Sequence, residues 1–274
     1  MVNNKTLIFG HKNPDTDSIM SSMVMANLEN QLGNEAIPVR LGKINKETEY
    51  VFNYLQIERP EEISDIEDGQ NVILVDHNES TQSANNISNA NILKVIDHHT
   101  MNFVAPYQLY YRAEPVGCTA TVLYKMYKEY DVEITKTIAT LMLSAIISDT
   151  LLLKSPTCTK EDKVIAEKLA KIAEVDLEKY GKDLLKAGTD ISDFTPEEVI
   201  NIDSKLFEKG GKKFKIAQIN TADIDDVFKN KAYFETAINN EIANENLDLY
   251  VFAATDILNL KSLCREPMSL TLIM

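Results

Sequence analysis

Three short apolar runs in the N-terminal part of the chain each end abruptly in polar side chains. They cover residues 6–10, 72–75 and 92–96. Runs of this length that are rich in Val and Ile predict buried strands of a parallel sheet. Because parallel strands place their carboxyl ends at one edge, we expect the polar residues after these runs to meet where open α/β sheets bind ligands.

Imidazoles and carboxylates follow all three runs. They are His11, Asp15 and Asp17 after the first run, Asp76 and His77 after the second, and Asp97, His98 and His99 after the third. These endings contain all 4 histidines of the chain. Because consecutive side chains of an extended segment point in opposite directions, we expect at most two of the last three residues in one ligand shell.

Helical and strand periodicity alternate along the N-terminal two thirds of the chain. Further strands are predicted at 36–41 and 108–112, and helices at 18–32, 46–56, 117–130, 160–173 and 177–187. The polar segment 80–91 is expected to hold one short helix. Strands that alternate with helices predict an α/β fold with a doubly wound parallel sheet.

Residues 137–148 form an unusually apolar helical segment that ends in Asp149. A helix that is apolar on nearly all sides must be buried. A buried charge without a partner is costly, and a metal ion is one of the partners that can compensate it. Asp149 therefore joins the candidate ligands.

A second, smaller α/β domain is expected in the C-terminal third. The run 188–196 is rich in loop residues, so we predict a first domain at 1–188, a linker at 189–195 and a second domain at 196–274. Within the second domain, strands at 203–208 and 213–220 flank Gly210-Gly211 as a hairpin. One long helix at 223–244 and a strand at 247–255 follow.

Charge and cysteine usage limit the classes of function. The net charge is −14 over 274 residues without a basic block, which argues against a nucleic acid or an anionic membrane as partner. The 3 cysteines are far apart and include no Cys-x-x-Cys pair, which argues against disulfides and structural zinc. No stretch resembles a signal segment or approaches the roughly 18 apolar residues of a membrane span, so we expect a cytoplasmic protein.

The candidate ligands suit a pair of hard divalent cations. Carboxylates with imidazoles and no thiolate match Mn²⁺, Mg²⁺ or Co²⁺. Asp15 and Asp17 are two residues apart in a predicted loop, so each could serve a different ion. Two ions roughly 3.5–4 Å apart can clamp the attacking and leaving oxygens of a phosphoryl transfer. Such a pair also needs a carboxylate common to both ions, and Asp76 is our candidate.

Several motifs in this order resemble those of the DHH phosphoesterase superfamily. They are His-x-Asn-Pro-Asp-x-Asp at 11–17, Asp-His-Asn at 76–78, Asp-His-His at 97–99 and Ser-Asp at 148–149. With Asp-His-Asn-Glu at 76–79 and Glu-Pro-Val-Gly-Cys-Thr-Ala-Thr at 114–121, the sequence is similar to the manganese-dependent, family II inorganic pyrophosphatases. The resemblance runs from Lys5 to about Leu258. It implies that a metal-bridged hydroxide hydrolyses pyrophosphate to two phosphates.

The resemblance also implies a role for each candidate residue. The metal ligands would be His11 and Asp15 for one ion, Asp17, His98 and Asp149 for the other, and Asp76 for both. His99 would be a catalytic group that faces the substrate, and Lys205 would bind phosphate from the second domain. His77 and Asp97 would support the ligands without binding metal.

The same resemblance implies the cofactors and partners. Each chain would hold two Mn²⁺, with Co²⁺ as an alternative, and Mg²⁺ would arrive with pyrophosphate. The first domain, the DHH metal-binding catalytic domain, would form a homodimer.

One departure from the family affects the expected activity. The family carries a Ser-Arg-Lys-Lys-Gln stretch near its C-terminus, whose arginine and lysine grip the phosphates, and this chain has none. Residues 264–274 look unrelated to the family, and we interpret the second domain as incomplete through truncation or a frame shift. Because each lost charge-assisted contact costs about 1.5–3 kcal/mol, we expect reduced catalytic efficiency.

Alternative readings remain open at this stage. Another DHH enzyme, acting on short oligonucleotides or cyclic dinucleotides, would carry a Gly-Gly-Gly-His type motif, whereas here Lys212 follows Gly210-Gly211. A catalytically impaired metal-binding protein would explain the missing stretch. Lys205 could be a solvated surface lysine. Residues 117–119 could be a simple helix start or could offer backbone amides to a phosphate.

Overall fold

The computed structural model describes residues 5–258, 264–265 and 271–273. The chain divides into two compact units, Met1–Gly188 and Thr189–Met274. Most of 264–274, where we expected unrelated sequence, lies outside the described residues. No described helix has both the length and the apolar character needed to cross a bilayer.

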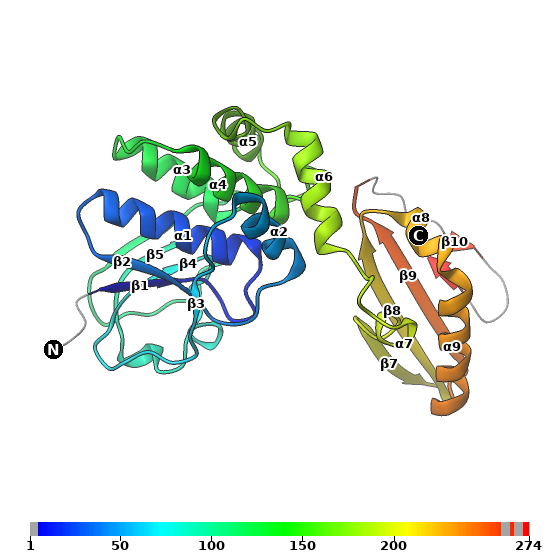
Figure 1. Ribbon diagram of the computed structural model, residues 1–274. Coiled ribbons are helices and arrows are strands. Elements are labelled where there is room, and N and C mark those ends of the chain that lie inside the picture. Colours follow the sequence, from blue (N-terminus) through cyan, green and yellow to red (C-terminus); the bar gives the residue numbers. More distant parts are fainter. Residues whose placement is uncertain (1–4, 259–263, 266–270, 274) are drawn as a thin grey trace. The chain divides into compact units, whose positions relative to one another are not determined.

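The first unit contains a six-stranded sheet in the order β3-β2-β1-β4-β5-β6 (Figure 1). Its strands are β1 Thr6–Phe9, β2 Ala36–Arg40, β3 Glu61–Glu62, β4 Asn71–Val75, β5 Asn91–Asp97 and β6 Tyr110–Ala113. All neighbouring strands are parallel, which confirms the predicted α/β fold. Strand β3 was not predicted because Glu61-Glu62 has no apolar pattern. The strand order reverses between β1 and β4, where ligands bind in sheets of this topology.

Helices cover one face of this sheet. They are α1 Thr16–Gln31, α2 Lys46–Leu55, α3 Thr119–Glu129, α4 Lys136–Asp149, α5 Lys160–Ala173 and α6 Leu177–Gly188. Helix α1 packs on β1, β2 and β4, and α4 packs on α1, α3 and α5. All residues of α4 from Ile138 to Ile147 are buried, as the apolar pattern predicted.

Irregular segments cover the opposite face of the sheet. Phe9, Val72, Leu74 and Val95 point to this side and pack with Ile66, Ile87 and Phe103. The 3₁₀ turns Ser80–Gln82 and Ile87–Asn89 replace the single short helix that we expected there. Because most of β1, most of β4 and the end of β5 are buried, they form a rigid edge for the polar side chains that follow.

The second unit contains a mixed sheet in the order β10-β11-β9-β8-β7. Its elements are α7 Pro196–Val199, β7 Ser204–Lys209, β8 Lys212–Thr221, α8 Ile224–Lys229, α9 Lys231–Glu245, β9 Leu249–Asp256, β10 Cys264–Arg265 and β11 Thr271–Ile273. Strands β7 and β8 form the predicted hairpin, and Gly210 and Gly211 have φ of +61° and +73°. Glycine adopts such angles without steric cost.

The single long helix predicted at 223–244 is wrong. The structure has two helices, α8 and α9, which are interrupted at Asn230. Val227, Phe234 and Ile238 keep the spacing of one helix face and pack in the same core. The apolar pattern therefore continues across the break and gave no sign of it.

Candidate metal centre

The predicted ligands meet at the carboxyl edge of the first sheet. His11 follows β1, Asp76 follows β4, His98 follows β5, and Asp149 is the last residue of α4. Three groups have potential ligand atoms that lie within 4.8 Å of one another: His11, Asp15 and Asp76; Asp17, Asp76, His98 and Asp149; and Asp76, His98 and His99. Asp76 belongs to all three groups. The first two groups together contain all six residues that we predicted as ligands.

The start of α1 holds two of these carboxylates. Asp15 is the N-cap, and its side chain accepts the amide of Ser18 at 3.0 Å. Asp17 lies in the first helical turn, so our expectation of a loop at this position was wrong. It is buried, and its Oδ2 accepts the amide of Thr119 at 2.7 Å. A Cβ on Gly10 would lie 1.9 Å from Ser18 Oγ, so glycine allows the helix to begin this close to β1.

Asp76 has an unusual backbone. Its φ is +58°, a left-handed conformation that costs energy for most residues but is more common for Asp and Asn. Its amide donates to the carbonyl of Ile96 at 3.0 Å, and its Oδ1 accepts the hydroxyl of Thr119 at 3.0 Å. The surrounding structure thus holds this buried carboxylate at the centre of the cluster.

The ring of His11 is oriented as a ligand would be. Its Nδ1 lies 2.8 Å from the carbonyl oxygen of Lys12. A carbonyl only accepts hydrogen bonds, so Nδ1 carries the proton and Nε2 of the neutral ring keeps its lone pair. That Nε2 faces Asp15 Oδ2 at 3.4 Å and Asp76 Oδ2 at 3.5 Å.

The ring of His98 is oriented in the same way as that of His11. Its Nδ1 lies 3.1 Å from the carbonyl oxygen of Val116, and its Nε2 faces Asp76 Oδ1 at 3.4 Å and Asp149 Oδ2 at 3.6 Å. This Nε2 is buried and has no hydrogen-bond partner among the described residues. A buried lone pair directed at two carboxylate oxygens fits a shared cation, and protein ligands at about 2.0–2.2 Å from one ion have separations of this size.

The carboxylates of the cluster repel one another. Burial raises the pKa of Asp76 well above its usual value, and the charges of Asp17, Asp15 and Asp149 raise it further. Burial also raises the pKa of Asp149 well above its usual value, and the charges of Asp17 and Asp15 raise it further. Cations in the cluster would remove this repulsion, so the donor set fits two hard divalent ions.

Comparisons with known proteins agree with this geometry. Residues 5–146 match the family model of the DHH family, N-terminal domain, and residues 182–270 match the DHHA2 domain. The manganese-dependent inorganic pyrophosphatase of Bacillus subtilis is 55% identical over 261 residues, which is 94% of this chain and 84% of that protein. The chain belongs to the manganese-dependent, family II inorganic pyrophosphatases.

Solved structures extend the likeness to the fold. A Methanococcus jannaschii protein, provisionally described as a family II inorganic pyrophosphatase, is 40% identical with a TM-score of 0.69, and the match covers 92% of this chain and 84% of that one. An exopolyphosphatase-related protein from Bacteroides fragilis shares the fold at 14% identity and a TM-score of 0.55, over 91% of this chain and 76% of that one. The DHHA2 match continues to residue 270, past Leu258, where we expected the resemblance to fade.

Within this family II pyrophosphatase, Asp97 supports its neighbours through hydrogen bonds. Its Oδ1 accepts the amides of His98 at 2.8 Å and His99 at 3.1 Å, and also faces His99 Nδ1 at 2.9 Å. Although burial opposes the effect, the bonds from His99 and Asn78 lower the pKa of Asp97. The bond to Asp97 raises the pKa of His99, whose side chain is half exposed. Asp97 belongs to none of the three ligand groups found among the described residues, and its supporting role stays a prediction.

His77 lies behind the cluster. Its Nδ1 is 2.9 Å from the carbonyl oxygen of Val75, and its Nε2 is 3.1 Å from Ser83 Oγ. Burial lowers the pKa of His77 to about 4, so the ring is neutral near pH 7. Through these two contacts the ring of His77 connects the end of β4 to Ser83. Its supporting role stays a prediction.

The segment 117–119 binds carboxylates through its amides. Gly117 donates to Asp162 Oδ2 at 2.9 Å, and Thr119 donates to Asp17. Asp162, on α5, also accepts the hydroxyl of Thr121 at 2.6 Å. These bonds favour the reading of 117–119 as a helix start that supports the ligands. Sequence reasoning missed Asp162 because its partners Gly117 and Thr121 are far away in the chain.

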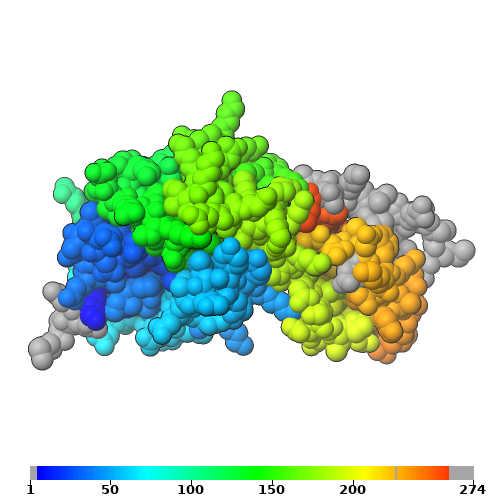
Figure 2. All heavy atoms as spheres, turned by 45° about the horizontal axis from the view of Figure 1, so that its top comes forward, coloured from blue at the N-terminus to red at the C-terminus, as the bar shows by residue number. Residues whose placement is uncertain are grey.

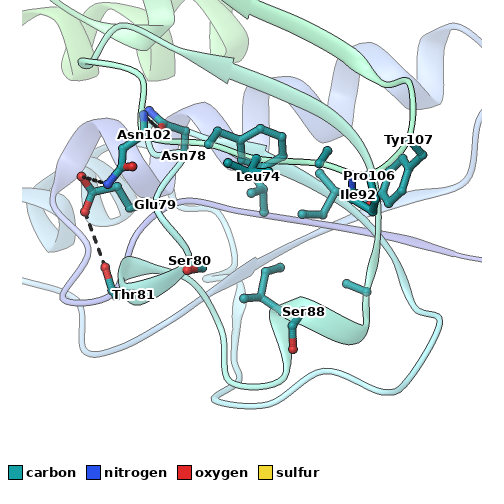
Figure 3. A pocket seen from close by; sticks show the side chains of 15 residues that line it. Leu74, Asn78, Glu79, Ser80, Thr81, Ser88, Ile92, Asn102, Pro106 and Tyr107 are labelled. Atoms are coloured by element: carbon teal, nitrogen blue, oxygen red, sulfur yellow. Dashed lines mark hydrogen bonds between the residues drawn. The ribbon is translucent and has the colours of Figure 1, made fainter.

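Two cavities have Asn78 and Glu79 in their linings, just after Asp76 in the chain. One, of about 270 Å³, is lined by His11, Asp76, His77, Asn78, Glu79, Gln82, His99 and Thr100. The other, of about 470 Å³, lies under the irregular layer, with Asn78 and Glu79 at one end and Ile92 and Tyr107 at the other (Figure 3). Its only charged lining residue is Glu79, whereas the smaller cavity contains imidazoles and the central carboxylate. The smaller cavity is therefore the candidate substrate site.

Lys205 lies on β7 of the second unit. Its side chain is exposed, and its backbone pairs with Ile216 of β8. Phosphate binding by Lys205 stays a prediction.

Proposed function

We propose that this chain hydrolyses inorganic pyrophosphate to two phosphates at a centre of two Mn²⁺ ions. The observation that carries the proposal is the pair of ligand groups that share Asp76. His11 and Asp15 would hold one ion, and Asp17, His98 and Asp149 the other. Divalent ions, when bound, neutralise charge on the phosphates. They also lower the pKa of a bound water, so that hydroxide is available near neutral pH to attack phosphorus.

The surrounding residues prepare the site for an anionic substrate. His99 projects into the cavity, and Asp97 stabilises the protonated form of its ring. A protonated His99 would neutralise charge on a phosphate oxygen or donate a proton to it. Mg²⁺ that arrives with pyrophosphate would supply further positive charge. The ammonium group of Lys205 would also contribute positive charge. Co²⁺ would suit the same oxygen and nitrogen donors.

An assay of phosphate release tests this proposal. We expect the purified chain to release phosphate from pyrophosphate when Mn²⁺ and Mg²⁺ are present and to lose this activity when a chelator removes the metals. The turnover should be slower than that of a relative with the Ser-Arg-Lys-Lys-Gln stretch, because each missing phosphate contact costs about 1.5–3 kcal/mol.

The same assay separates the alternatives. Cleavage of a short oligonucleotide or a cyclic dinucleotide in preference to pyrophosphate would identify a different DHH phosphoesterase. Binding of Mn²⁺ without cleavage of any of these substrates would identify an impaired metal-binding protein. Turnover equal to that of a relative with the Ser-Arg-Lys-Lys-Gln stretch would contradict the proposed loss of efficiency.

We also propose that the first unit forms a homodimer through the edge at β6. Strand β6 ends the sheet order, and the loop before it exposes Met101, Val104 and Tyr107. The side chain of Val104 is 95% exposed. An apolar loop beside an unpaired strand edge is a surface that a second copy can cover.

Light scattering on the purified protein measures the oligomeric state. We expect a dimer for the wild type and dissociation toward monomer for Val104→Glu, because a carboxylate would be buried at the contact. Val164→Glu, at an exposed apolar position on α5, is the matched control and should leave the dimer intact. A monomeric wild type would contradict the proposal.

A further inference from the structure

Glu47 connects two segments that carry ligands. It lies in the first turn of α2, outside the three ligand groups. Its Oε1 accepts the hydroxyl of Thr16 at 2.6 Å and also accepts the hydroxyl of Ser148. Thr16 stands between Asp15 and Asp17 in the chain. One carboxylate oxygen thus joins the start of α1 to the end of α4.

The position of Ser148 makes this contact important for the cluster. Ser148 immediately precedes Asp149, which belongs to the same ligand group as Asp17. Glu47 is 31 residues from Thr16 and 101 residues from Ser148 in the chain. A change in the side chain of Glu47 would therefore remove a hydrogen-bonded link between two packed helices, and both carry candidate ligands of the same ion.

Helix α2 gives Glu47 a rigid base. The side chain of Asn45 accepts the amide of Thr48 at 2.8 Å and caps the helix. Helices α2 and α6 lie side by side (Figures 1 and 2), and the ring of Tyr180 packs against Tyr50 and Tyr54 with centroid distances of 5.9 and 5.0 Å. These contacts do not involve the candidate ligands, so α2 can hold Glu47 in place before a metal binds.

Charge alone does not explain a glutamate at this position. The negative charge of Asp15 repels the ionised side chain of Glu47, and the cluster already contains several carboxylates. A neutral side chain of similar size would fill the space at a lower electrostatic cost. A carboxylate, however, accepts two hydroxyl bonds strongly at one oxygen. The gain from these bonds offers a reason for the extra negative charge.

We propose that Glu47 is a positioning residue for the metal centre, and that it sets the spacing between the Asp15–Asp17 segment and Asp149 through Thr16 and Ser148. The inference rests on the proposed metal centre. Hydrogen bonds that orient metal ligands typically change metal affinity by about 10–100-fold when they are removed. Loss of the Glu47 oxygen that accepts both hydroxyls should have an effect of this size, although Glu47 lies outside the three ligand groups.

Titration of the metal-free protein with Mn²⁺, without substrate, tests the proposal. We expect Glu47→Ala to weaken Mn²⁺ binding by about 10–100-fold. Glu47→Gln keeps an oxygen that can accept both hydroxyls and should bind Mn²⁺ within a few fold of the wild type. Glu49→Ala is the matched control, because Glu49 lies in the same helical turn and pairs with Arg59 at the surface. It should bind Mn²⁺ as the wild type does.

A double-mutant cycle tests whether Glu47 acts on the metal centre through Ser148. We expect Ser148→Ala to weaken Mn²⁺ binding, and the double variant to lose less affinity than the sum of the two single changes. If Glu47→Ala does not fold, Ser148→Ala and Glu47→Gln decide the question. The proposal is overturned if Ser148→Ala binds Mn²⁺ like the wild type, or if Glu47→Gln binds as weakly as Glu47→Ala.

The wild-type titration separates this inference from the proposed function. If the wild type binds two Mn²⁺ and Glu47→Ala binds them equally well, only the positioning role fails. If the wild type binds no Mn²⁺, the metal centre fails and the positioning role fails with it. Thermal melting of the metal-free variants shows whether they are folded at the temperature of the titration.

Discussion

Asp76→Asn should reduce pyrophosphate hydrolysis by at least about 100-fold and weaken the binding of both Mn²⁺ ions. Asp76 is 2% exposed and belongs to every ligand group, so both ions lose a charged ligand. Removal of one partner of a buried charge pair costs about 3–5 kcal/mol, which corresponds to a factor of roughly 100 or more. Because Asn tolerates the φ of +58° about as well as Asp, the substitution changes the charge with little change in the backbone.

The same variant should have the opposite effect on the metal-free protein. Burial raises the pKa of Asp76, and the charges of Asp17, Asp15 and Asp149 raise it further, so a neutral Asn removes an unfavourable buried charge. We expect metal-free Asp76→Asn to melt at a higher temperature than the metal-free wild type. Asp65→Asn, at an exposed carboxylate outside the ligand groups, is the control for both measurements. Wild-type activity and Mn²⁺ affinity in Asp76→Asn would show that Asp76 is not the shared ligand.

Removal of metal should lower the thermal stability of the first unit substantially. An ion that binds only the folded state stabilises it by about 4 kcal/mol at a concentration 1,000-fold above its Kd. For a domain of this size, 1 kcal/mol corresponds to about 2–4 °C, so each ion should raise Tm by about 8–16 °C under these conditions. Scanning calorimetry with Mn²⁺ and with a chelator measures the difference.

The Asp76→Asn variant provides the control for the metal effect. Its Tm should respond much less to Mn²⁺, because both sites lack the shared carboxylate. An equal rise in Tm for the variant and the wild type would mean that Mn²⁺ stabilises the protein elsewhere. No rise in the wild type would contradict the proposed centre.

Much of the ligand cluster was predictable because strand ends carry a clear signal. His11, Asp76 and His98 follow short apolar runs of the kind that favours buried strands, and parallel strands bring such ends together. Asp149 was predictable for a different reason, since it ends a helix that is apolar on nearly all sides. These local patterns determine where a side chain emerges, and the sheet topology then determines its neighbours.

Residues that act through distant partners were not predictable. Glu47 looks like any acidic residue in a first helical turn, and Asp162 looks like part of an ordinary capping box with Thr159. Their further bonds, to Ser148 and to the amide of Gly117, depend on tertiary contacts that no local pattern contains. The start of α1 was misjudged because Asn13-Pro14 suggested a longer loop, whereas Asp15 caps the helix at once.

The position of Asp149 at the end of α4 has a consequence for synthesis on the ribosome. His11, Asp15 and Asp76 are made early, whereas Asp149 is made only when most of the first unit has been translated. If both groups bind ions, as proposed, the site of His11 can be complete before the site that needs Asp149. Binding of the first ion could then assist the folding of the strands made early, and the second ion would bind later.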